Sequence, residues 1–91
     1  METRIAVIAV IVEGDSQSTE ELNHLLHEAG SYIIGRMGIP YRQKNVNIIS
    51  IAIDAPQDVI STLSGRIGRL PGVSVKTAYS QVKTPAQEEK C

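Results

Sequence analysis

The segment from Gly35 to Arg42 contains the residues best suited to bind a ligand. It reads Gly-Arg-Met-Gly-Ile-Pro-Tyr-Arg. A glycine in a strand, such as Gly38, leaves room for a bound molecule or a second backbone. The guanidinium groups of Arg36 and Arg42 match an anionic group. The same residues also suit an edge strand that bends at glycine and is protected from aggregation by charge and proline. The sequence leaves both interpretations open.

Glu20, His24 and His27 are the candidates for binding a metal ion. On a helix, Glu20 and His24 are one turn apart, and the three side chains offer ligands to zinc or nickel. Histidines on the polar side of an amphipathic helix need no metal to explain them. We therefore predict no metal site and keep a metal-responsive sensor as an alternative. The single cysteine, Cys91, excludes an internal disulfide.

The chain carries no sequence signature of catalysis. It has no phosphate-binding Gly-Lys-Ser/Thr loop, no nucleophile motif and no pair of cysteines. We predict that it is not an enzyme and needs no cofactor. Its 9 Lys and Arg nearly balance its 10 Asp and Glu, which argues against direct binding to nucleic acid. The apolar run from Ile5 to Val12 is too short to span a membrane, so we expect a cytoplasmic protein.

This apolar run is the feature that most constrains the architecture. In a strand, alternate side chains point to opposite faces, so the run has two apolar rows. A small two-layer domain has helices for only one face of its sheet. We predict that the second row packs against another copy of the chain in a dimer or tetramer. We assign to this interface the row formed by Ala6, Ile8, Val10 and Val12.

Two helices and three further strands follow. Ser18 and Glu21 form a capping box that opens the first helix, and its apolar stripe comprises Leu22, Leu25, Leu26 and Ala29. An edge strand is expected over 32–42, because Pro40 lacks an amide hydrogen, and a third strand over 46–53. Pro56 suits the first position of the second helix. Its stripe comprises Val59, Ile60, Leu63, Ile67 and Leu70. The last strand is expected over 73–82.

The order βαββαβ is that of a ferredoxin-like α+β fold. Right-handed crossovers then give an antiparallel sheet of order 4-1-3-2 in a two-layer sandwich. We expect one domain over 1–83. The polar, proline-interrupted segment 84–91 is expected to be a disordered tail.

Gly65 and Gly68 lie opposite the apolar stripe of the second helix. Each glycine inside a helix costs about 1 kcal/mol relative to alanine. Close approach of a neighbouring chain or a ligand would offset this cost, so we assign both residues to the oligomer interface. The other interpretation is that the helix loosens near Gly68 before Pro71.

Two blocks of the chain, 35–42 and 63–76, resemble the family of iron-only hydrogenase system regulators. These short, stand-alone proteins are similar to ACT domains and to the ligand-binding domain of nickel-responsive repressors. The resemblance implies a ferredoxin-like fold, oligomers built by sheet and edge contacts, and a regulatory role without a DNA-binding domain. The nickel site of those repressors is not implied, since both histidines here fall on one helix.

The resemblance also suggests where a ligand binds. In ACT-like domains the first strand-to-helix turn contributes to interface sites, which singles out Gly14 and Asp15 beside Arg36, Gly38 and Arg42. We therefore expect a homo-oligomeric ACT-like module that binds a small effector or a protein partner at a subunit interface. The alternatives are the metal sensor and a structural adaptor that binds no effector.

Overall fold

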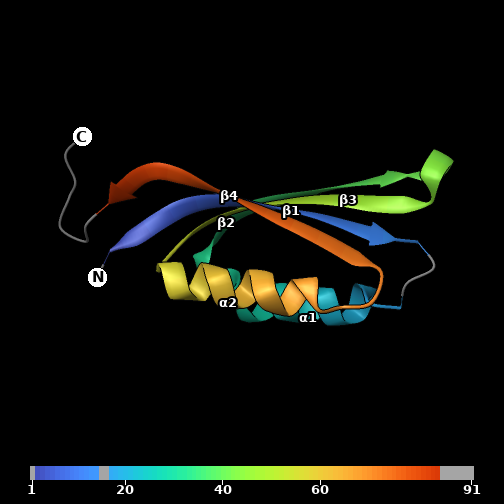
Figure 1. The fold of residues 1–91 in the computed structure, drawn as a ribbon, viewed down its shortest axis with the longest axis horizontal. Coiled ribbons are helices and arrows are strands. Elements are labelled where there is room, and N and C mark those ends of the chain that lie inside the picture. The colour runs from blue at the N-terminus through green and yellow to red at the C-terminus, as the bar shows by residue number, and fades with distance from the viewer. Residues whose placement is uncertain (1, 15–16, 85–91) are drawn as a thin grey trace.

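The computed structural model describes residues 2–14 and 17–84. Its elements follow the predicted order, with two short 3₁₀ helices, η1 and η2, added on either side of the second strand. The bounds are β1 Thr3–Glu13, α1 Thr19–Glu28, η1 Gly30–Tyr32, β2 Ile33–Tyr41, η2 Arg42–Lys44, β3 Val46–Ala55, α2 Gln57–Gly68 and β4 Val73–Thr84. The sheet order is β2-β3-β1-β4 with every pair antiparallel, which confirms the ferredoxin-like prediction. Both helices lie on one face of this sheet (Figure 1).

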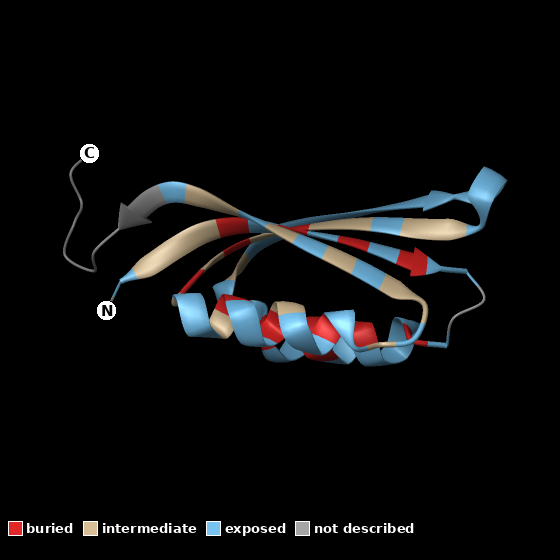
Figure 2. Ribbon diagram, in the orientation of Figure 1, coloured by how far each residue is buried: buried red, intermediate tan, exposed pale blue. Residues whose placement is uncertain are grey.

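The core lies between the helices and the inner face of the sheet (Figure 2). Both helical stripes are confirmed in it, with Leu22, Leu25 and Leu26 from α1 and Ile60, Leu63 and Ile67 from α2. The strands contribute Ala6, Ile8, Val10, Val12, Ile51, Ile53 and Ala55. The predicted interface row of β1 is therefore wrong. Its four side chains are at most 1% exposed and are covered by the helices of the same chain.

The other row of β1 belongs to the sheet face that the helices leave open. Val7 and Ile11 are 42% and 44% exposed, although both are central in the sheet. The neighbouring strands add Met37, Ile39, Tyr41 and Ile48 to the exposed large apolar side chains. We call the surface formed by Val7, Ile11, Met37, Ile39 and Ile48 the open face. The two apolar rows of β1 predicted an uncovered apolar face. The row of β1 that contributes to it contains Val7 and Ile11, whereas we had predicted the opposite row.

Strand β2 lies at the edge of the sheet, as predicted, and within residues 2–14 and 17–84 its one partner strand is β3. Its register shifts between Ile33 and Gly35. Ile33 pairs with Ile53 and packs against the core, whereas Arg36 pairs with Ile51. Even-numbered residues after the shift therefore share the helix-covered side of the sheet, and odd-numbered residues lie on the open face.

The turn before β4 is hydrogen-bonded to Glu13 and to Ser18, which lie at either end of the connection between β1 and α1. Ser18 is 4% exposed, and its hydroxyl donates to the carbonyl oxygen of Pro71 at 2.7 Å. The predicted capping box does not form, because the Ser18 side chain makes no capping bond to the helix. The amide of Glu13 donates to the carbonyl oxygen of Gly72 at 2.9 Å. Glu13, at the end of β1, and Ser18, just before α1, are therefore both bonded to the segment Pro71–Gly72.

The side of α2 that carries Ser64 and Gly68 faces β4 of the same chain. A Cβ atom on Gly68 would lie 3.0 Å from Cγ1 of Val75, and Ser64 shares a 2.8 Å hydrogen bond with Thr77. The close neighbour of Gly68 is therefore its own strand, contrary to the interface assignment. Nothing lies within 4 Å of a Cβ atom built on Gly65. Thr84 ends β4 and so belongs to the sheet, while the rest of the expected tail lies outside the described residues.

Candidate functional site

Arg36 and Gly38 lie together in a groove between α1 and β2. The groove has a volume of about 260 Å³. Its apolar walls come from Val12, Leu22 and Ile49, and its polar groups come from Thr19, Asn23, Arg36 and Asn47. We call it the Arg36 groove. The register explains the placement, because Arg36 and Gly38 both occupy the helix-covered side of β2.

Arg36 is the only charged side chain that lines this groove, among the residues that the structure describes. Its Nη2 atom donates to Oδ1 of Asn23 at 3.4 Å, which is a long hydrogen bond on an exposed side chain. Most of the five guanidinium donors therefore stay available. A carboxylate or phosphate group can accept two parallel hydrogen bonds from such a guanidinium. The amides of Asn23 and Asn47 add both donors and acceptors.

Gly14 and Arg42 lie in a different place, beside the turn between β2 and β3. They border a small cavity of about 80 Å³ together with Asn45 and Asn47. The amide of Gly14 donates to the backbone oxygen of Asn45 at 2.7 Å, so this amide is already engaged within the chain. Asp15 lies outside the described residues. Arg36 and Gly38 thus border one hollow together, Gly14 and Arg42 border another, and Asn47 borders both.

The sequence analysis missed three polar residues that line the Arg36 groove. Thr19 and Asn23 belong to α1, and Asn47 belongs to β3. Asn47 offered a signal, since it is the polar residue within the apolar run Val46-Asn47-Ile48-Ile49. Thr19 and Asn23 gave none, because their role depends on how α1 lies against β2.

The three candidate metal ligands do not form a metal site. His24 lies 3.1 Å from Oε2 of Glu28 instead, with both side chains about half exposed. Across residues 2–14 and 17–84, no group of three or more His, Cys, Asp or Glu side chains is placed to hold a metal ion. Within the same ranges no helix is both long enough and apolar enough to cross a membrane.

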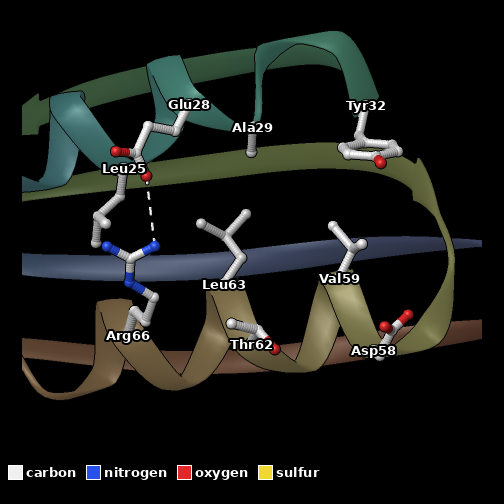
Figure 3. A pocket seen from close by; sticks show the side chains of 9 residues that line it. All are labelled: Leu25, Glu28, Ala29, Tyr32, Asp58, Val59, Thr62, Leu63 and Arg66. Atoms are coloured by element: carbon white, nitrogen blue, oxygen red, sulfur yellow. Dashed lines mark hydrogen bonds and ion pairs between the residues drawn. The ribbon is translucent and has the colours of Figure 1, made fainter.

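A third hollow separates the two helices (Figure 3). It has a volume of about 270 Å³ and an apolar floor of Leu25, Ala29, Val59 and Leu63. At one end, Nη1 of Arg66 on α2 lies 3.4 Å from Oε1 of Glu28 on α1, so an ion pair crosses the groove. Tyr32 and Asp58 lie at the other end (Figure 3). We call it the interhelical groove.

The order of elements and the antiparallel sheet place the chain in the class of small ferredoxin-like α+β domains. The family described as "TM1266-like: Iron-only hydrogenase system regulator, putative" matches residues 4–77. The chain belongs to this family, whose description is that of a regulator of the iron-only hydrogenase system.

Two solved structures share the fold, and the first also supports the family assignment. The uncharacterized protein TM1266 from Thermotoga maritima is 34% identical, with a TM-score of 0.82 over 85% of this chain and 96% of that one. The apo form of CPII, a nitrogen regulatory PII-like protein from Thiomonas intermedia K12, is 18% identical, with a TM-score of 0.55 over 93% and 98% of the two chains.

A formyltetrahydrofolate deformylase from Pseudomonas putida KT2440 is 14% identical, with a TM-score of 0.57 over 81% of this chain but only 28% of its own. At these identities, the deformylase and CPII show a shared fold and nothing more. No curated protein matches the chain.

Proposed function

We propose that the chain is a homo-oligomeric regulatory module whose copies pack through the open face, and that it binds a small anionic effector in the Arg36 groove. It acts in the expression or maturation of an iron-only hydrogenase and catalyses no reaction. The family's description as a regulator of this system supports the role. The observation that carries the proposal is the open face itself.

The open face is unusual for a surface that stays in water. Val7, Ile11, Met37, Ile39 and Ile48 are between 38% and 60% exposed, and the strand order makes them one continuous surface. Monomeric proteins rarely expose apolar patches of this kind. Covering a half-exposed side chain of this size contributes on the order of 1 kcal/mol. A second copy related by a two-fold axis offers the same surface in return.

Strand β2 physically connects the Arg36 groove to the open face. Arg36 and Gly38 lie in the groove, whereas their neighbours Met37 and Ile39 lie on the open face. An effector that binds Arg36 therefore contacts the same strand that carries part of the proposed interface. This arrangement gives the effector a route to alter association.

Association is tested by analytical ultracentrifugation of the wild type and two lysine variants. We expect a dimer or tetramer at micromolar concentration and a monomer for Ile11→Lys, because the charge would be buried in the interface. Gln43→Lys adds the same charge at the exposed β2–β3 turn and should leave association unchanged. A folded wild-type monomer at these concentrations would refute the oligomer.

Effector binding is tested by a thermal-shift screen of carboxylates, phosphates and nucleotides. Any stabilising anion should lose its effect in Arg36→Gln and keep it in Arg42→Gln, since Arg42 borders the other cavity. If a stable oligomer responds to no anion, the structural adaptor becomes the better explanation. If Arg42→Gln alone abolishes the shift, the effector site lies beside Gly14 instead.

A further inference from the structure

The interhelical groove plays no part in the proposed function, yet its size suits a small molecule. Its volume of about 270 Å³ equals that of roughly nine water molecules in the liquid. This corresponds to a ligand of about ten non-hydrogen atoms. The floor of Leu25, Ala29, Val59 and Leu63 offers such a ligand an apolar surface between two polar ends.

The charged groups of this groove define the charge that the ligand must carry. Glu28 and Arg66 lie at one end and Asp58 lies at the other (Figure 3). Two carboxylates and one guanidinium leave one excess negative charge. Among the described residues, no hydrogen bond or ion pair engages the Asp58 side chain. Its carboxylate is therefore available to a cation.

The Glu28–Arg66 ion pair is weak enough to be exchanged for a ligand. Its nitrogen and oxygen are 3.4 Å apart, and the side chains are 47% and 46% exposed. Pairs of this kind contribute only about 0–1 kcal/mol. A zwitterionic head group that gives its carboxylate to Arg66 and its ammonium to Glu28 replaces one exposed pair with two charge-assisted ones.

The distance along α2 sets the length of the ligand. Asp58 and Arg66 are eight residues apart, which is about 12 Å along a helix axis. An extended aliphatic chain that starts at Arg66 runs over Leu63 and Val59 toward Asp58. A cationic end group there meets the Asp58 carboxylate and the ring of Tyr32.

We propose that the interhelical groove binds a basic α-amino acid of the lysine or arginine type. Its head group lies between Glu28 and Arg66, its methylene groups cover the apolar floor, and its terminal cation pairs with Asp58. The net charge of such a ligand, plus one, complements the excess negative charge of the groove. A neutral or acidic amino acid leaves Asp58 unpaired.

Isothermal titration calorimetry on the full chain tests this directly. L-norleucine keeps the carbon chain of L-lysine and lacks only the terminal amine. We expect lysine to bind about two- to fivefold more tightly than norleucine, as one additional exposed ion pair provides, and glutamate to bind most weakly. No heat with lysine or arginine at millimolar concentration, or equal affinity for lysine and norleucine, would overturn the proposal.

Substitutions then locate the binding. Asp58→Asn should abolish the preference for lysine over norleucine, and Arg66→Gln should weaken both ligands. Glu20→Gln removes a carboxylate from the first turn of α1 outside the groove and should change neither. Circular dichroism confirms that each variant is folded. A lysine preference that survives Asp58→Asn would place the ligand elsewhere. Arg36→Gln should leave lysine binding intact, which separates this site from the anion site.

Discussion

Gly14 and Asn45 are packed backbone to backbone where the end of β1 meets the turn between β2 and β3. The Gly14 amide donates to the Asn45 carbonyl oxygen at 2.7 Å. A Cβ atom on Gly14 would also lie 2.7 Å from that oxygen and would overlap the Asn45 side chain. Asn45 itself has a positive φ of 54°. No side chain fits at position 14 unless this turn moves.

Gly14→Ala should therefore destabilise the fold. Because backbone atoms must shift, we expect the free energy of unfolding to fall by about 1–3 kcal/mol. Urea denaturation followed by circular dichroism measures the change. Gly30→Ala is the matched control, since nothing lies within 4 Å of a Cβ atom at that position. Equal unfolding free energies for the two variants would show that the β2–β3 turn can shift at little cost in stability.

Arg4 should anchor the start of α2 to the sheet. Its guanidinium donates to Oε1 of Gln57 at 2.6 Å and to the carbonyl oxygen of Ser80 at 3.0 Å, and it lies 4.7 Å from the centre of the Tyr79 ring. Arg4→Met keeps the apolar stem but loses these contacts. We expect a loss of about 1–2 kcal/mol in unfolding free energy.

Arg69→Met provides the comparison for Arg4→Met. Arg69 is exposed at the end of α2, and its side chain has no ion pair or hydrogen bond with the described residues. We expect its removal to change stability by no more than about 0.5 kcal/mol. If both variants lose the same amount of unfolding free energy, the contacts of Arg4 make no measurable contribution to stability.

The two glycines of α2 should respond differently to alanine. Gly65→Ala should raise stability by about 0.5–1 kcal/mol through helix propensity, because the added methyl group meets nothing in the chain. Gly68→Ala should gain less, since its methyl group would press against Val75. Thermal unfolding combined with sedimentation measures stability and association together. If the proposed oligomer forms, its dissociation by Gly65→Ala would mean that another copy packs against this side of α2.

The order of elements and the helical stripes were predictable from local periodicity, and the sheet order followed from the handedness of the crossover connections. The sequence did not predict which of the two apolar rows of β1 packs against the helices. Both rows are apolar, so alternation alone gives no preference between Ile8 and Val7. The choice depends on pairing, since Ile8 lies opposite Ile51 and Val7 lies opposite Ala52. The clearer alternation of β3, with Ile51 and Ile53 against Ser50 and Ala52, decides which side of both strands is buried.

The candidate site was only half predictable for a related reason. Arg36 and Gly38 were visible as an unusual pair in one strand, and the alternation of β2 keeps them on the same side. Arg42 leaves that alternation because it begins η2. Asn23 joins Arg36 only through the packing of α1 beside the sheet, and Asn47 joins it only through the pairing of β3 with β2. No local pattern reports a contact between residues so far apart in the chain.

The segment Pro71–Gly72 receives one hydrogen bond from the last residue of β1 and another from Ser18, just before α1. Gly14, between these two donors, is bonded to the β2–β3 turn. Three connections that are distant in sequence therefore share a single junction at one end of the molecule. A displacement of α1 along its axis would pull on β4 and on the tip of the β2–β3 hairpin at once. Hydrogen bonds thus couple the start of β4 to both ends of the β1–α1 connection.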